Sequence, residues 1–587
     1  MAKRGIALVL TLIGLAAVVS IAGLLLLYLM VSREPDVARQ STLVLRPSGE
    51  LHEMAPDDVF GAFIGVETAT VRGFVDNLRK AQRDPRITSV LLMPGSLDLP
   101  FWAKVQELRD AVVEFRKSGK TVVAFLEYGG DREYYLASAA DRVFLLPTSP
   151  LDLTGVASYE VFLRGTFDMI GAYPDFHHIG EYKTAPNQLT ERSFTPAHRE
   201  MAESLNRDMY EQLVRGIADA RRKSEADVRA LLDQGPFLPE DALRAGLVDD
   251  LVYEDQIDDR VQELKPDSGE VRRVDGGAYG RISPRSVGIR PRSRIAVLYA
   301  VGVIASGKSS VDPINGAVAG SETIVEQIRQ ARDDESVKAI VLRVDSPGGS
   351  STASDVIWRE LTITRDENPS RPLVASMSDL AASGGYYIAM PAQEIVAQPA
   401  TLTGSIGIYT GKLVTGGTLA KLGITTETVT SGRNADIYSP FTRFSPDQQS
   451  KVEEYMQAFY DQFVEKVAKS RQMSPERVDA IAQGRVWTGR QARELGLVDQ
   501  LGGLDAAVAV AKQRARIPAD EDVELVTYPP RRSFYESLAA RFGGSAPAAL
   551  AALGARGDTR ALAALTAPIR LFRRGEPLAL MPFTVVR

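Results

Sequence analysis

The chain has 587 residues, of which 44% are hydrophobic and 25% are charged, a composition typical of a globular protein with several domains. It contains no cysteine, which excludes disulfides, thiolate-bound metals and a cysteine nucleophile. The net charge of −6 is unfavourable for general nucleic-acid binding. We therefore expect no cofactor, no metal and no nucleic-acid partner, and the histidines are too few for a multi-histidine centre: His52, His177, His178 and His198.

The first element in chain order is an uncharged run at residues 5–31, which is long enough to cross a bilayer as one helix. A cleaved signal peptide has an apolar core of only about 7–15 residues, so a retained transmembrane anchor is predicted. Lys3 and Arg4 precede the run, whereas Glu34 and Asp36 follow it. The positive-inside rule then predicts a single-pass membrane protein with a cytoplasmic N-terminus and the rest of the chain outside the cytoplasm.

After the anchor, the chain repeats itself at an offset of about 250 residues. For example, Leu-Val-Asp-Asp-Leu at 247–251 returns as Leu-Val-Asp-Gln-Leu at 497–501, and Leu-Thr-Gly at 153–155 returns at 402–404. We therefore predict two tandem copies of one domain, at 45–255 and 293–528. A linker rich in Gly, Pro, Ser and Arg is predicted at 256–292, and an Ala-rich basic tail at 529–587, with short amphipathic helices at 534–542 and 548–555.

Each copy alternates strand and helix patterns, which indicates an α/β fold with largely parallel strands. A strand is predicted in the first copy at 87–93. The pattern in the second copy predicts strands at 295–301, 339–344, 373–377 and 394–397, and helices at 322–332, 355–364 and 451–470.

The two copies differ at positions suited to chemistry. The second copy has Gly348-Gly349 after a strand, and the matching stretch of the first copy, Gly-Ser-Leu-Asp-Leu at 95–99, lacks the glycine pair. It also has Ser383-Gly384 where a strand leads into a helix, and the matching position of the first copy is Asp131. A serine at such a turn presents its hydroxyl, and the next N–H can face a developing oxyanion. Ser383 is therefore the candidate nucleophile, although serine is also a common helix N-cap.

A serine nucleophile needs a base, and the second copy has no histidine. The first copy offers Lys183 in the sequence Gly-Glu-Tyr-Lys, and no lysine occurs around the matching position Ala435. Because the lysine belongs to one copy and the serine to the other, we predict an active site divided between them. His177 or His178 as the base is the alternative.

These motifs together resemble the long, tandem-repeat form of signal peptide peptidase A, a family of membrane-anchored serine proteases with a Ser/Lys dyad and a Clp-protease/crotonase-like fold. The resemblance covers about residues 45–528. It implies Ser383 as nucleophile, Lys183 as general base and Ser405, in Thr-Gly-Ser-Ile-Gly, as a residue near the base. It also implies a homotetramer at the inner membrane, with the catalytic part in the periplasm and signal peptide remnants as substrates.

In the expected reaction, Ser383 attacks a peptide carbonyl, and the N–H of Gly384 with one from Gly348-Gly349 holds the oxyanion. A lysine titrates near 10.4 in water, so Lys183 must be buried to be neutral near pH 7. Glu181 would raise the pKa of the amine if it lay close, so we expect its side chain to point away.

Three other functions fit parts of the pattern. A protease for general quality control of envelope proteins would use the same dyad on other substrates. A crotonase-type acyl-CoA enzyme would share the fold, but its cofactor is cytoplasmic whereas the domains are expected outside. A non-catalytic scaffold would need neither Ser383 nor Lys183.

Overall fold

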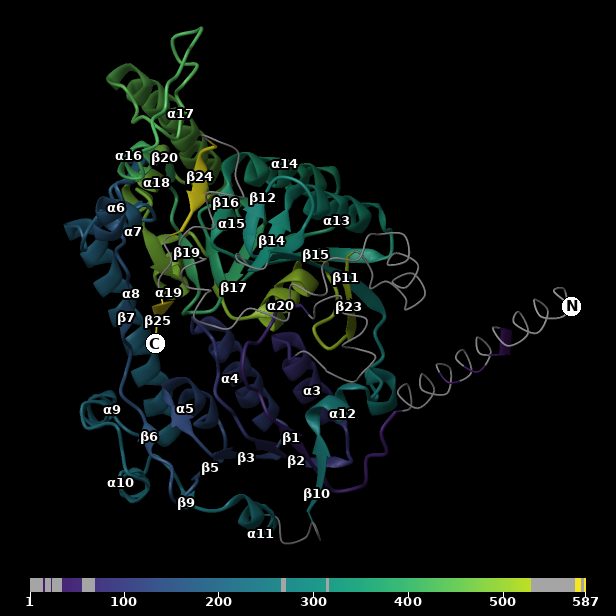
Figure 1. The fold of residues 1–587 in the computed structure, drawn as a ribbon. Helices are drawn as coiled ribbons and strands as arrows, with labels where there is room; N and C mark the ends of the chain where they lie inside the picture. The colour runs from purple at the N-terminus through teal and green to yellow at the C-terminus, as the bar shows by residue number, and fades with distance from the viewer. Residues whose placement is uncertain are drawn as a thin grey trace, which may run out of the picture.

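The computed structural model describes residues 34–54, 69–264, 271–312, 316–528, 576–581 and 585–586, together with positions 14, 15, 19 and 23. Most of the predicted anchor and tail, including both short tail helices, lies outside these residues. Within the described part of the chain, no helix is both long and apolar enough to cross a membrane. The two copies lie one above the other, the first in purple and blue and the second in teal and green (Figure 1).

The first copy is built on a parallel sheet with the strand order β10-β1-β2-β3-β5-β9. Its strands are β1 (Ser41–Leu45), β2 (Ile87–Leu92), β3 (Thr121–Leu126), β5 (Arg142–Leu145), β9 (Asp250–Leu251) and β10 (Arg272–Asp275). Its main helices are α3 (Val71–Arg83), α4 (Ala103–Arg116), α5 (Asp131–Ala137), α8 (Pro196–Arg221), α9 (Glu225–Leu232) and α10 (Pro239–Arg244).

The second copy is built on a sheet with the order β21-β19-β17-β15-β11-β23, and β18 pairs with β17 and with β22. Its strands are β11 (Ser293–Val301), β15 (Val337–Ser346), β17 (Leu373–Ala382), β18 (Glu394–Ala397), β19 (Leu402–Gly404), β21 (Val486–Thr488), β22 (Gln500–Leu501) and β23 (Val523–Thr527). Its main helices are α13 (Ser321–Asp333), α14 (Ser351–Glu367), α15 (Gly384–Ala389), α17 (Pro446–Arg471), α18 (Pro475–Ile481), α19 (Gly489–Leu495) and α20 (Leu504–Arg514).

The internal repeat is visible element by element. Helices α8 and α17 both have 26 residues, begin with a proline after a Thr or Ser N-cap, and end at a left-handed residue with φ 53°. A side-chain cap and a proline at the first helical position favour the same start in both copies.

The predicted strands and helices of the second copy are all present, and most of them extend beyond the predicted ends. For example, the strand predicted at 373–377 is β17, which continues through buried alanines to residue 382.

Of the segment 256–292, expected to be a linker, the described residues 256–264 and 271–292 contain helices and a strand that pack on the first copy. These include helix α11 (Ile257–Glu263) and strand β10, which pairs in parallel with β1 as β23 pairs with β11. Downstream of β10, Tyr279 is fully buried and donates a hydrogen bond of 3.0 Å to Asp84. Because β10 lies at the edge of the sheet and exposes most of its side chains, its sequence lacks the hydrophobic alternation of a half-buried strand.

A third sheet joins the copies, with the order β13-β14-β12-β16-β24-β20-β8. Strand β8 of the first copy pairs antiparallel with β20 of the second over seven residue pairs, and only β24 separates β20 from β16. Its strands are β8 (Tyr173–Ile179), β12 (Val303–Ala305), β13 (Ser310–Asp312), β14 (Gly316–Gly320), β16 (Gly348–Ser350), β20 (Ile408–Val414) and β24 (Leu578–Leu580).

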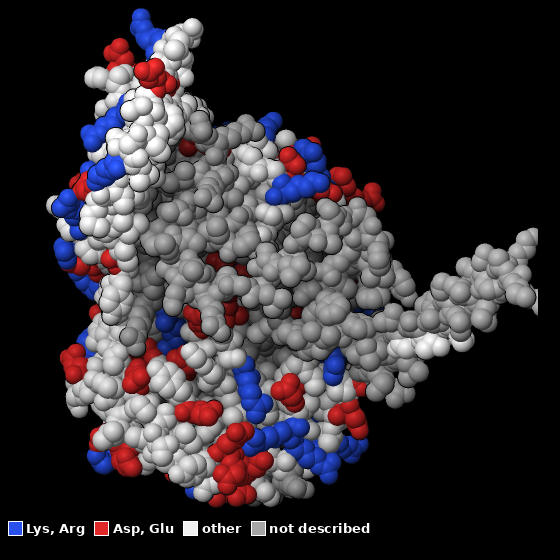
Figure 2. Space-filling view, viewed as in Figure 1, with Lys and Arg blue, Asp and Glu red and all other residues white. Residues whose placement is uncertain are grey.

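The charged side chains on the face shown in Figure 2 are mixed in sign. Over the lower half, which belongs to the first copy, Lys and Arg lie next to Asp and Glu. In the first copy, Arg273 and Asp258 form an ion pair 2.8 Å apart. The expected absence of a nucleic-acid partner stays a prediction.

Candidate active site

Ser383 lies at the junction of β17 and α15 and is fully buried. Its backbone has φ 57° and ψ −112°, a conformation that L-amino acids rarely adopt. The Ser383 N–H donates to the carbonyl oxygen of Gly404 over 2.7 Å, which fixes this turn to the end of strand β19. The strand–turn–helix arrangement therefore presents the hydroxyl from a sharp turn, as the sequence predicts.

Lys183 reaches Ser383 from the first copy because β8 is paired with β20 and the loop after β8 lies on residues 483–484. The Tyr182 N–H donates to the carbonyl oxygen of Gln483 over 2.8 Å. A Cβ atom on Gly484 would lie 2.5 Å from the Lys183 backbone, so only glycine permits this contact. The divided site predicted from the sequence is brought together by this contact.

The three predicted side chains meet inside the protein. Lys183 Nζ lies 2.7 Å from Ser383 Oγ, and 3.0 Å from both the hydroxyl and the carbonyl oxygen of Ser405. All three residues have 0% exposed surface. Burial holds the pKa of the Lys183 amine well below its usual value. Glu181, two residues earlier, is exposed to solvent, as expected if its carboxylate points away from the amine.

The glycines expected to form an oxyanion site lie next to Ser383. Gly348 and Gly349 have φ of 98° and 155°, and a Cβ on Gly348 would lie 2.6 Å from the backbone nitrogen of Gly384. The N–H of Gly348 already donates to Ser346 Oγ over 3.1 Å. This leaves the N–H groups of Gly349 and Gly384 as the candidate donors, so Gly348 has a conformational role.

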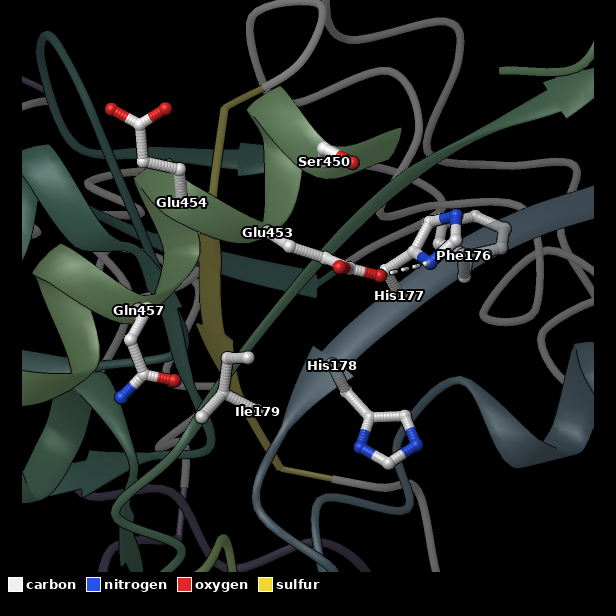
Figure 3. Close-up of a pocket in the computed structure, with 8 residues that line it drawn as sticks. All are labelled: Phe176, His177, His178, Ile179, Ser450, Glu453, Glu454 and Gln457. Carbon is white, nitrogen blue, oxygen red and sulfur yellow. Dashed lines mark ion pairs between the residues drawn. The ribbon is translucent and has the colours of Figure 1, made fainter. Parts of the chain in front are cut away.

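The two histidines proposed as an alternative base lie elsewhere. His178 Nδ1 is 2.9 Å from the carbonyl oxygen of Gly180, and His177 lies within 3.5 Å of Asp175 and 3.9 Å of Glu453. Both line an open cavity of about 600 Å³ between β8 and α17, and Figure 3 shows the ion pair of His177 with Glu453. Neither Ser383 nor Lys183 lines this cavity, so we do not assign the reaction to it despite its large volume.

Sequence reasoning missed a group of buried charges close to the dyad. Lys104 of α4 lies 2.8 Å from Asp345 and 3.7 Å from Asp379, which belong to the strands that lead to Gly348 and Ser383. Arg343 of β15 is fully buried and pairs with Glu53 and Glu107 of the first copy. These groups are far apart in the chain. The only sequence signal was that Asp345 and Asp379 stand in the two catalytic motifs.

Comparisons with known proteins agree with this geometry. The family model described as peptidase family S49 matches twice, at residues 114–266 and 365–518. The chloroplastic serine protease SPPA of Arabidopsis thaliana is 37% identical over 456 residues, which cover 77% of this chain and 66% of that protein. Protease 4 of Salmonella typhi is 34% identical over 454 residues, covering 76% of this chain and 72% of that protein.

Two further comparisons are more limited. A protein of Enterococcus faecium designated a candidate signal peptide peptidase SppA is 35% identical over 207 residues, covering 35% of this chain and 59% of that protein. A mutant of the 1510-N membrane-bound stomatin-specific protease, in complex with a substrate peptide, is 14% identical and covers 43% of this chain and 98% of its own. Its TM-score of 0.25 is too low to support a fold assignment. On the two family matches and these two relatives, SPPA and Protease 4, the chain belongs to peptidase family S49 and is a serine protease.

Proposed function

We propose that the chain hydrolyses peptide bonds through an acyl-enzyme, with Ser383 as nucleophile and Lys183 as general base. The observation that supports this most directly is the 2.7 Å contact between Lys183 Nζ and Ser383 Oγ in a fully buried setting. A buried amine without a proton can accept one from the serine hydroxyl, and it can later give that proton to the leaving amine.

The surrounding groups have separate tasks in this mechanism. Ser405 contacts the amine through its hydroxyl and carbonyl oxygens, and so positions the Lys183 lone pair toward Ser383. The N–H groups of Gly349 and Gly384 stabilise the oxyanion, and each such donor contributes about 2.7–4 kcal/mol in known enzymes. The mechanism requires no cofactor.

The proposed substrates are signal peptide remnants. The proposed location is the outer face of the inner membrane, with the N-terminus in the cytoplasm. The proposed assembly is a homotetramer of chains with a Clp-protease/crotonase-like fold. The motif resemblance supports this choice, as does the designation of the Enterococcus faecium relative. A protease for general quality control of envelope proteins would have the same dyad. The two proposals are distinguished by letting signal peptides and unfolded envelope proteins compete for the enzyme and measuring which of them is cut faster.

The first test is hydrolysis of a fluorogenic leucyl or alanyl peptide by the purified full-length chain in detergent. Ser383→Ala and Lys183→Ala should each lower kcat by about 10⁴-fold or more, whereas the double variant His177→Ala/His178→Ala should keep its activity. Loss of activity in the histidine variant, with activity retained in Lys183→Ala, would move the base to a histidine. A folded wild type without activity on either peptide would contradict the proposed mechanism for this substrate class.

The pH profile gives a second readout. Because protonated Lys183 cannot accept a proton, kcat/KM should fall as the pH is lowered through the depressed pKa of this amine. The acid limb should therefore lie well below the usual lysine value of about 10.4. A kcat/KM that still rises steadily up to pH 10 would show that the amine is not held neutral.

A further inference from the structure

A segment from near the end of the chain fills the slot between the two strands that flank the site. Strand β24 (Leu578–Leu580) pairs antiparallel with β16 on one side and with β20 on the other (Figure 1). The Met581 N–H donates to the carbonyl oxygen of Pro347 over 2.8 Å, and the Ser351 N–H to that of Pro577 over 3.3 Å. Proteins often bind extended peptides in this way, by adding a strand to the edge of a sheet.

The register places Ala579 at the reaction centre. Ala579 is paired with Gly349, and a Cβ on Gly348 would lie 2.0 Å from its carbonyl oxygen and 2.6 Å from the Gly384 nitrogen. A Cβ on Gly384 would also lie only 3.1 Å from the same oxygen. The carbonyl group of Ala579 is therefore beside the N–H groups assigned to the oxyanion, next to Ser383.

The side chains of the segment fit this slot. Leu578 and Leu580 are 7% and 1% exposed and belong to one apolar cluster with Val303 and Tyr409, which Phe176 contacts at its edge. Because side chains alternate along a strand, Ala579 points to the opposite face, where it is completely buried.

The segment is also held just before this strand. Glu576 contacts both flanking strands, because Ser350 donates to its carboxylate and Thr410 donates to its carbonyl oxygen over 3.3 Å. The contacts from Glu576 to Met581 therefore hold an extended backbone across the site, as a bound substrate would be held.

We propose that residues 576–581 are a substrate of the active site of their own chain, cut between Ala579 and Leu580. This inference rests on the proposed function. Ser383 Oγ bonds to the carbonyl carbon of Ala579 while Lys183 takes the hydroxyl proton. The bond to the Leu580 nitrogen then breaks, and the leaving amine receives that proton. Water hydrolyses the resulting ester, which leaves a chain ending at Ala579 and a released peptide of residues 580–587.

Until the cut is made, the segment excludes other peptides from the slot. It also defines the substrate class of the site: an extended peptide with a small residue on the carbonyl side of the cleaved bond and a leucine-sized residue before and after that small residue. These preferences follow from the fully buried position of Ala579 and the apolar cluster around Leu578 and Leu580.

Intact mass spectrometry of the full-length chain in detergent tests the proposal, with Ser383→Ala as the uncut reference. We expect the wild type to convert to a species ending at Ala579 with a half-life that does not change on tenfold dilution, whereas Ser383→Ala stays whole. A wild type that hydrolyses the fluorogenic peptide but keeps residues 580–587 overturns the inference and leaves the proposed function intact. A wild type that cuts neither overturns both, and a half-life that lengthens with dilution overturns cleavage within one chain.

A variant pair tests the register. Ala579→Arg places a long charged side chain at a fully buried position, so self-cleavage should slow by at least about tenfold, and the fluorogenic peptide should be cut faster than by the uncut wild type. Ala435→Arg makes the same change at an exposed position and should behave as wild type. Equal self-cleavage in both variants would show that Ala579 does not occupy the site in this register.

Discussion

The backbone of Ser383 is strained, and the strain serves to aim its hydroxyl. Ser383 and Ser405 both have positive φ values, 57° and 50°, and both hydroxyls lie against the Lys183 amine. Non-glycine residues in such regions cost about 1–3 kcal/mol and persist only where the surroundings hold them. Here the hydrogen bonds from the Ser383 and Ser405 N–H groups to Gly404 and Arg485, each 2.7 Å, hold the two turns in place.

This strain predicts that Ser383→Gly is more stable than Ser383→Ala. Both variants lack the hydroxyl and should be inactive, but glycine adopts φ 57° without steric cost, whereas alanine retains the strain. The free energy of unfolding should be higher for the glycine variant by about 1 kcal/mol, after allowing for its more flexible unfolded chain. Urea unfolding of the two proteins measures the difference, and a glycine variant no more stable than the alanine variant would show that the turn is not strained.

The sequence was informative about which residues carry the chemistry, and uninformative about their surroundings. Comparison of the copies pointed to Ser383 and Lys183, because each occurs in one copy only. Ser405 was found through the motif resemblance alone. The positive φ of Ser383 has no sequence signal, since serine is common at ordinary helix N-caps.

At the scale of elements, the site depends on a contact between two turns. Gly180 and Gly484 both have positive φ, and each lies against the backbone of the other turn: a Cβ on Gly180 would lie 2.4 Å from Gln483, and one on Gly484 2.5 Å from Lys183. No side chain larger than hydrogen fits between these backbones. The two glycines therefore set how closely the loop of the first copy approaches the nucleophile of the second.

We expect Gly484→Ala to lower kcat/KM by about 100-fold, because the added methyl group pushes the Lys183 backbone away from Ser383 and a displacement of about 1 Å has this effect in other enzymes. Gly423→Ala is the matched control, since Gly423 has nearly the same φ, 74° against 76°, but nothing within 4 Å of its added Cβ. Peptide hydrolysis by the two variants provides the comparison. Similar activities would mean that the close contact does not position Lys183.

The element scale also explains where sequence reasoning failed. The core strands of the second copy were predicted because they are continuous apolar runs, as parallel strands covered on both faces are. Strand β10 reads Arg-Arg-Val-Asp and was assigned to a linker, because an edge strand with exposed side chains has no such run. The equivalence of β10 with β23 appears only from their pairing with β1 and β11.

At the scale of the whole molecule, the two copies are joined by buried charges. Arg343 of the second copy donates to Glu53 over 2.8 Å and 3.0 Å, and to Glu107 over 2.6 Å. Burial alone would raise the pKa of Glu53, but Arg343 lowers it to about 2. Such ions are costly to bury unless they are paired, and Arg343 finds its two carboxylate partners only when both copies are in place.

A second cation, Lys104 of the first copy, contacts the second copy. Its backbone N–H donates to Asp379 over 2.9 Å, while its amine lies 2.8 Å from Asp345. Burial raises the pKa of Asp379 to about 6 despite the neighbouring lysine. These two aspartates stand on the strands that end at Gly348 and Ser383, so the position of the catalytic turns depends on the charge balance at the interface between the copies.

Lys104→Met should therefore destabilise the protein by about 3–5 kcal/mol, because it leaves two buried carboxylates without their cation. Lys117→Met makes the same change in an exposed pair with Glu114 and should cost at most about 1 kcal/mol.

The cost of Lys104→Met should also depend on pH. A carboxyl group whose folded pKa lies above its unfolded value of about 3.9 binds its proton more tightly in the folded state, so lowering the pH through that pKa stabilises the fold. Without Lys104 the pKa of Asp379 should rise above 6. The deficit should then be largest above pH 7 and smaller at pH 5, as measured by urea unfolding at both pH values. A deficit equal at both, or equal to that of Lys117→Met, would mean that the lysine does not balance the two aspartates.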